Sequence, residues 1–303
     1  RQLQIPRTAG PHGAPPSRPG TAPRPQALTA RHGPAYDPCR PVGRPFPPTQ
    51  VEAGSGPRGS VVLLTFWSVK GGSGTTVVAA AVAGAAARRA GRALLVDLRG
   101  DQPAAVGVAE PTGPGVRDWL AADGRTPDAL ERLVLAVDDR LGLLPQGTPG
   151  PWPNGRHDEL VEALQRTGGA VVVDAGAIDP IVWRGSATGA EGSRAGPEAL
   201  AAGLAAAGTS LLVLRPCYLA LRRAVRAGGR ADGVVLVVEP GRALGRRDVE
   251  QVLDAPVVAT VESSTRLVAS TSSTAWTCPR ACLYSLAKLY PAKRMTLAGV
   301  SAR

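Results

Sequence analysis

Short apolar runs alternate with segments of helical character between residues 59 and 262. Runs with the length and composition of buried strands lie at 61–66, 93–98, 141–144, 170–173, 209–214, 233–238 and 257–261. Segments with helical character lie between them, at 77–90, 115–120, 127–137, 157–166, 219–227 and 248–253. A strand–helix alternation is typical of a mostly parallel sheet, because each crossover between parallel strands needs a connection of helix length. The pattern therefore predicts an α/β domain over 59–262, with helices on both faces of the sheet.

The segments on either side of this domain have a different composition. Residues 1–58 hold 14 of the 29 prolines and no apolar periodicity, so we expect a disordered Pro/Arg-rich segment. Residues 263–303 contain no acidic residue, but they hold the single methionine and half of the cysteines and tyrosines. We expect an irregular, disordered basic tail there. Its abrupt change of character favours a segment out of register with the natural reading frame, and a membrane-touching basic tail is the alternative.

The net charge of +11 belongs to the flanks and not to the domain. Residues 1–58 carry eight arginines against two acids, and 263–303 carry six basic residues, whereas the segment between them is nearly neutral. A charge argument for nucleic acid therefore does not apply to the domain as a whole. One local cluster, Arg222, Arg223 and Arg226, fits a solvated helix face or a surface for DNA or a partner. The widely spaced cysteines and the lack of an 18-residue apolar run indicate a cytoplasmic protein.

A glycine-rich segment follows the first predicted strand and precedes an Ala/Val-rich helix. It reads Lys70-Gly71-Gly72-Ser73-Gly74-Thr75-Thr76. Glycines let the backbone turn its N–H groups inward around an anion, and the helix N-terminus adds about half a positive charge. Lys70 is the only lysine before residue 288 in a chain that otherwise uses arginine, and a compact ammonium suits a phosphate loop. Strand, loop and helix together predict a phosphate-binding P-loop, with the Thr76 hydroxyl as a Mg²⁺ ligand.

Two carboxylates lie at the carboxyl ends of predicted strands, where ligands gather in such sheets. Asp174 follows the run 170–173, and beside the loop it can hold Mg²⁺ through water. Asp97 lies at the end of the run 93–98, and its alternative role is to cap a turn. Residues 175–196 are small and glycine-rich, which suits a mobile segment next to the site.

The loop resembles the deviant Walker A motif of the ParA/MinD family of P-loop ATPases, Lys-Gly-Gly-x-Gly-Lys-Thr. The early lysine is present as Lys70, whereas Thr75 stands at the second lysine, which contacts the β- and γ-phosphates in the family. The strand end Leu144-Pro145-Gln146-Gly147 is similar to the family's Leu-Pro-x-Gly. The altered loop is closest in character to the septum-site-determining and CpaE/TadZ-like members.

The family's switch I has the pattern Asp-x-Asp, with an acid near the attacking water. In this chain Asp97 matches the first acid, Arg99 stands at the second, and Asp101 follows two residues later. The resemblance implies catalytic roles for Lys70, Asp97 and Asp101, but it leaves open which acid orients the water. It also implies that residues 70–76 bind ATP or ADP and that Thr76 and Asp174 hold Mg²⁺.

The resemblance implies a nucleotide-dependent switch that organises septum, chromosome or pilus machinery. Such a protein forms a nucleotide-dependent homodimer in which Lys70 reaches the partner's phosphates, and it works with a protein partner of that machinery at the membrane or septum. The alternative is a non-hydrolysing pseudo-ATPase that acts as scaffold or regulator, because Thr75 removes a charge from the phosphate site. A metabolic P-loop kinase is disfavoured because the sequence shows no acceptor-site motif.

Overall fold

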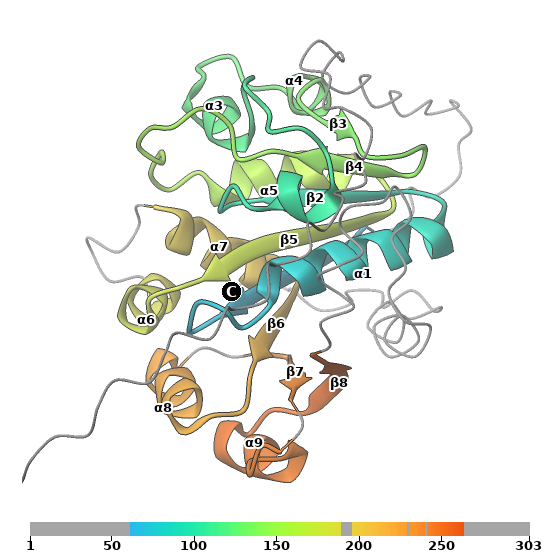
Figure 1. Cartoon of the computed structure of the whole chain (residues 1–303). Coiled ribbons are helices and arrows are strands. Elements are labelled where there is room, and N and C mark those ends of the chain that lie inside the picture. The colour runs from blue at the N-terminus through green and yellow to red at the C-terminus, as the bar shows by residue number, and fades with distance from the viewer. Residues whose placement is uncertain (1–60, 189–195, 229–230, 240, 264–303) are drawn as a thin grey trace, which may run out of the picture. The chain divides into compact units, whose positions relative to one another are not determined.

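The computed structural model describes residues 61–188, 196–228, 231–239 and 241–263. The disorder expected for 1–58 and the irregular tail expected beyond 263 lie outside these residues. Within them, eight strands form one sheet in the order β3-β4-β2-β5-β1-β6-β7-β8 (Figure 1). The strands are β1 Val62–Ser68, β2 Ala93–Asp97, β3 Leu135–Ala136, β4 Leu141–Leu144, β5 Ala170–Ala177, β6 Thr209–Leu214, β7 Gly233–Val238 and β8 Val257–Glu262.

Strand β1 occupies the middle of the sheet, with β5 on one side and β6 on the other. All pairings are parallel except the one at the edge, where β3 runs antiparallel to β4. Parallel strands that are covered on both faces consist almost entirely of apolar residues, as in the fully buried run Val171–Val173 of β5. This confirms the α/β class and the mostly parallel sheet.

Helices cover both faces of the sheet. They are α1 Thr75–Ala90, α2 Gln102–Val106, α3 Val116–Ala121, α4 Pro127–Glu131, α5 His157–Arg166, α6 Pro180–Thr188, α7 Pro197–Ala207, α8 Tyr218–Ala227 and α9 Arg246–Leu253. One buried cluster joins α3 to α9 to one face through side chains such as Leu130, Leu160 and Leu204. The opposite face is packed by α1 and by Val106 of α2. None of the helices in the described part of the chain is long and apolar enough to cross a membrane.

Helix α1 lies against the strands on which the glycine-rich loop is built. Its inward side is almost entirely alanine, including Ala79, Ala83 and Ala86, each with at most 1% of its surface exposed. Small side chains let the helix axis approach the sheet closely, and they cost little side-chain entropy when they are buried. The helix ends at Gly91, a left-handed C-cap with φ 81°.

The helix expected over 127–137 is wrong beyond its first turn. The Thr126 hydroxyl caps its start by accepting the N–H of Ala129, but the helix ends at Glu131. Leu135–Ala136 then form β3 and pair with the edge strand β4. Pairing with an open sheet edge satisfies backbone groups that a longer helix would have satisfied internally, so tertiary context overrides the local pattern.

Three further differences lie near the loop. Strand β5 continues to Ala177 instead of ending before Asp174, because β1 extends to Ser68 and pairs with it across an irregularity at Phe66/Trp67. The glycine-rich segment 175–196, which suited a mobile segment, contains helix α6, and helix α2, which was not predicted, begins at Gln102. The pattern also missed α7, whose alanines show no marked polar face; Leu200 and Leu204 form its buried stripe.

Candidate functional site

The glycine-rich loop connects the end of β1 to the first turn of α1. Gly72 and Gly74 have φ of 75° and 90°, in the left-handed region that glycine adopts without strain. Gly74 is the N-cap of α1 and offers no side-chain hydrogen bond, so the helix begins without a side-chain cap. The first N–H groups of an α-helix have no intrahelical partner and form a ready anion site. The loop therefore combines left-handed glycines with a helix N-terminus that has no side-chain cap, and this geometry suits an anion such as phosphate.

Two serine hydroxyls donate hydrogen bonds to the backbone of the loop. The Ser73 Oγ donates to the carbonyl of Lys70 at 2.7 Å, and the Ser68 Oγ donates to the same oxygen at 3.2 Å. Both serines are buried, whereas Lys70 is exposed. The backbone at Lys70 is thus fixed while its ammonium remains at the surface. Its charge helps to lower the pKa of Glu239 at the end of β7, where a hydrogen bond from Arg242 is the largest cause.

Asp174 lies at the base of the loop with its side chain fully buried. Burial, together with the charge of Asp97 on the neighbouring strand, raises its pKa from 3.8 to about 6. The Thr76 hydroxyl and the Gln102 amide both donate hydrogen bonds to its carboxylate, the latter at 2.8 Å. The structure therefore brings together Thr76 and Asp174, the two residues predicted to hold Mg²⁺.

Gln102, at the start of α2, is a site residue that the sequence analysis missed. Its Nε2 donates to the Thr76 carbonyl at 3.0 Å as well as to Asp174. Its Oε1 is buried and has no hydrogen-bond partner among the described residues. A buried acceptor beside a threonine hydroxyl and a carboxylate fits a hydrated divalent cation, because such an ion keeps several of its waters and these donate. Only its position after a strand-end acid could have drawn attention to it.

Asp97 is engaged by the backbone that follows it. Its Oδ1 accepts the N–H groups of Arg99 at 2.9 Å and Gly100 at 2.8 Å, and its Oδ2 accepts that of Gln102 at 3.0 Å. Burial raises its pKa and the Asp101 charge adds to this effect, while the three N–H groups oppose it. This is the turn-capping role that the sequence left as an alternative. The carboxylate fixes the segment from β2 to α2, which carries Arg99, Asp101 and Gln102.

A cavity of about 410 Å³ opens above the loop. It is lined by Ser68, Gly71–Val77, Arg99, Asp101, Gly176 and Ala177. Of the predicted site residues, Gly71–Thr76 and Asp101 line this cavity, and Asp97 and Asp174 are buried residues outside its lining. Lys70 lines a neighbouring cavity instead.

Searches among known proteins give matches of fold only. A scan of protein-family models finds no match, and a search of curated protein sequences finds none either. Among solved structures, the MinD cell division protein of Aquifex aeolicus matches with TM-score 0.55 and 18% identity, over 79% of this chain and 100% of that chain. The septum site-determining protein MinD of Pyrococcus horikoshii, complexed with Mg-ADP, matches with TM-score 0.53 and 18% identity, over 75% and 94%. A ParA family ATPase of Chlorobium tepidum matches with TM-score 0.50 and 17% identity, over 75% of this chain and 98% of that chain.

The fold is that of the MinD and ParA ATPases. On this MinD/ParA fold β2, β5 and β1 are neighbours in the strand order, so the glycine-rich loop lies beside the carboxyl ends of β2 and β5. The P-loop NTPase-like architecture expected from the sequence is thereby confirmed for the described residues.

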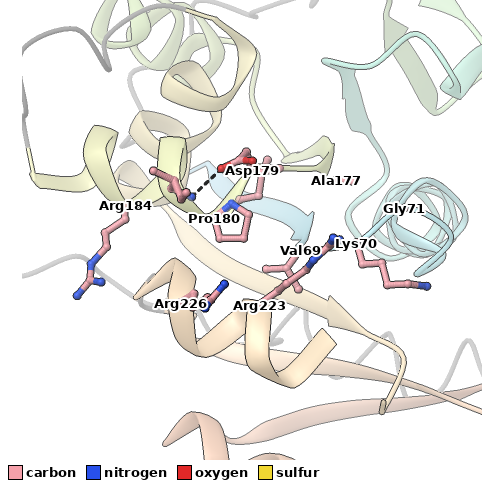
Figure 2. A pocket seen from close by; sticks show the side chains of 11 residues that line it. Val69, Lys70, Gly71, Ala177, Asp179, Pro180, Arg184, Arg223 and Arg226 are labelled. Carbon is pink, nitrogen blue, oxygen red and sulfur yellow. Dashed lines mark hydrogen bonds between the residues drawn. The ribbon is translucent and has the colours of Figure 1, made fainter. Parts of the chain in front are cut away.

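The second cavity, of about 650 Å³, lies beside the loop between α6 and α8. Figure 2 shows Arg223 and Arg226 extending from α8 and Arg184 from α6, together with Lys70 of the loop. Asp179 is the acidic residue among those that line it, so the cavity is strongly basic. All three arginines of the cluster noted in the sequence are exposed, and two of them, Arg223 and Arg226, line the cavity beside the loop.

Proposed function

We propose that this chain is a MinD/ParA-type switch protein that binds ATP and ADP with Mg²⁺ and hydrolyses ATP weakly or not at all. One observation carries the proposal. Gly72 and Gly74 have left-handed backbone dihedrals and precede helix α1, whose N-terminus has no side-chain cap. The Thr76 hydroxyl, in the first turn of α1, is hydrogen-bonded to the buried Asp174. The P. horikoshii MinD on the same fold was crystallised with Mg-ADP.

The residues present fit the nucleotide and its metal ion. The N–H groups of 71–76 would hold phosphate oxygens, and Thr76 and Asp174 would hold Mg²⁺, which neutralises phosphate charge when bound. Gln102 orients Asp174, and Asp97 orients the segment that bears Asp101. Both oxygens of Asp97 are already bonded, so Asp101, which is exposed in the cavity, is the better placed acid to orient a water.

The proposal includes assembly. We expect a nucleotide-dependent homodimer in which the exposed Lys70 reaches the phosphates of the other subunit. A MinC:MinD cell division protein complex of A. aeolicus has the same fold, with 18% identity and TM-score 0.53. By this analogy we propose a protein partner from division, partitioning or pilus machinery, and a location at the membrane or septum.

The second candidate function is a non-hydrolysing scaffold, and Thr75 favours it. Thr75 is buried in the first turn of α1, with 5% of its surface exposed, and it places no charge in the cavity. Removing one electrostatic contact to a transition state typically costs about 10²–10³ in rate. Thr75→Lys should therefore raise phosphate release by a factor of this order if the site is otherwise competent.

Calorimetric titration of the full chain with ATP and ADP, with and without Mg²⁺, tests the proposed function. We expect binding of both nucleotides, and stronger ATP binding when Mg²⁺ is present. Asp174→Asn should abolish the Mg²⁺ dependence and retain weak binding through the loop amides. A phosphate-release assay on the same samples bears on the two candidates: release that Lys70→Ala abolishes supports the switch and excludes the scaffold, and binding without release favours the scaffold. Absence of any nucleotide binding at millimolar concentration refutes both.

A further inference from the structure

The cavity above the glycine-rich loop contains one basic side chain among the described residues that line it. That side chain is Arg99, from the segment between β2 and α2. Lys70 belongs to the lining of the neighbouring cavity, and the position of the second loop lysine is occupied by Thr75. A polyphosphate carries several negative charges, so loop amides and a helix dipole leave much of its charge unneutralised.

Arg99 is held in a specific arrangement. Its Nε donates to the carbonyl of Ala175 at 2.7 Å, and its Nη2 donates to that of Ala177, also at 2.7 Å. Nη2 also pairs with Glu198 of α7 at 3.0 Å. Its Nη1 has no hydrogen-bond partner among the described residues. These three contacts use the Nε–H and both hydrogens of Nη2, which leaves the two Nη1 donors to bind another acceptor.

Gly176 makes room for this arrangement. It has φ 61°, and a Cβ built on it would lie 2.5 Å from the Arg99 Cγ. A side chain at 176 would therefore both strain the backbone and displace the arginine. The backbone of β5 is shaped to seat Arg99 at the rim of the cavity, so its position there is built into the fold.

We propose that Arg99 is the phosphate-binding cation of this site and takes the place of the lysine that the loop lacks. The inference rests on the proposed nucleotide binding. The Nη1 N–H groups can donate to phosphate oxygens, and such charge-assisted bonds are about twice as strong as neutral ones. Glu198 restrains Arg99 and partly neutralises it, so this carboxylate lowers the affinity for phosphate.

The test is calorimetric titration of the full chain with Mg-ATP, for variants at both ends of the Arg99–Glu198 pair. Arg99→Gln should weaken binding by about 10-fold or more, as expected for loss of a hydrogen bond to a charged group. Glu198→Gln should strengthen it several-fold, because it removes a negative charge next to the ligand. Adding Thr75→Lys to Arg99→Gln should recover most of the loss, since a cation returns to the same cavity.

Arg125→Gln is the matched control. Arg125 also pairs with a glutamate, Glu159, and also donates to backbone carbonyls, but it does not line the cavity. This variant should bind Mg-ATP like the unchanged chain. Thermal denaturation of every variant, without nucleotide, separates loss of affinity from loss of folding.

The outcomes are distinguishable. If the unchanged chain binds no nucleotide, the proposed function fails and this inference fails with it. If the unchanged chain binds and neither Arg99→Gln nor Glu198→Gln alters the affinity, the proposed function stands and Arg99 is not the phosphate-binding cation. If Arg99→Gln does not fold, Glu198→Gln decides: tighter binding supports the inference, and unchanged or weaker binding overturns it.

Discussion

The buried carboxylate of Asp174 should destabilise the nucleotide-free protein, and Asp174→Asn should relieve this. The side chain is fully buried beside a second acid, Asp97, and its pKa is raised from 3.8 to about 6. A buried charge without a full set of partners is costly, and sites of this kind are kept for function at the expense of stability. We therefore expect the asparagine variant to be more stable than the unchanged chain near pH 7.5.

The magnitude follows from the pKa. A rise from 3.8 to about 6 corresponds to about 3 kcal/mol of stability lost once Asp174 is ionised in the folded state. The asparagine keeps an acceptor for the Gly176 N–H, but it weakens the bonds from Thr76 and Gln102, each worth about 1 kcal/mol. A net gain of about 1–2 kcal/mol remains, which is about 2–8 °C in Tm for a domain of this size.

The pH dependence has a defined sign. Between pH 4 and about 6 the unfolded chain releases the Asp174 proton while the folded chain retains it, so the folded state binds more protons and stability falls as pH rises. Below pH 4 both states are protonated, and the asparagine variant loses its advantage. Thermal denaturation without nucleotide or Mg²⁺, in steps from pH 4 to 8, measures this difference.

Asp118 supplies a control of opposite sign. Burial alone would raise its pKa, but the hydrogen bonds it accepts from the Thr148 hydroxyl and from the N–H groups of Gly115 and Thr148 lower it. Asp118→Asn should therefore lose stability near neutral pH, and this loss should shrink in acid. An Asp174→Asn variant that is no more stable at pH 7.5 than at pH 4, relative to the unchanged chain, would refute the reasoning about Asp174.

Three further predictions concern the loop and its surroundings. Gln102→Leu removes a hydrogen bond that lowers the pKa of Asp174, so the midpoint of the pH dependence of Mg-ATP binding should move to higher pH. An unchanged midpoint would contradict the role given to Gln102. Gly72→Ala should lower the free energy of unfolding, measured by urea denaturation, by about 1–2 kcal/mol because Gly72 has a left-handed φ of 75°. Gly71→Ala should lower it little, because a Cβ at Gly71 meets no atom within 4 Å. Trp183 is buried and stacked on Trp67, with ring centroids 4.7 Å apart. Trp183→Ala should lower the free energy of unfolding by about 3–5 kcal/mol. A loss below about 1 kcal/mol would show that α6 contributes little to the core.

The sequence predicted the parts of the fold that local pattern controls. The strands at 141–144, 209–214 and 233–238 and the helix at 157–166 match the structure residue for residue, because each is an uninterrupted apolar run or is bounded by clear polar signals. The helix over 127–137 failed where an open sheet edge competed for the backbone. Helix α7 was missed because its alanines give no polar face to mark its period.

The candidate site was predicted to the extent that it lies on one motif. The residues from Gly71 to Thr76, which were predicted to bind nucleotide, line the cavity, and Thr76 contacts Asp174 across about a hundred residues of sequence. Gln102 was not predicted, because its role depends on the side-by-side pairing of β2 and β5, which places the start of α2 over the Asp174 carboxylate. Such a contact has no signature in either segment alone.

The chain departs from the pattern of the ParA/MinD family, which its loop resembles, at Thr75 and Arg99, and the fold connects these two positions. Taken separately, Thr75 removes a lysine from the loop and Arg99 replaces an acid in the following segment, and each suggests an impaired site. In the structure both residues line one cavity, so the exchange removes a cation from the helix side and places one on the side of β2 and β5. If the charge has moved in this way, nucleotide binding is preserved while the cation that the family uses at the β- and γ-phosphates is no longer supplied by α1. The proposed nucleotide binding and the proposed weak or absent hydrolysis would then both follow from these two residues.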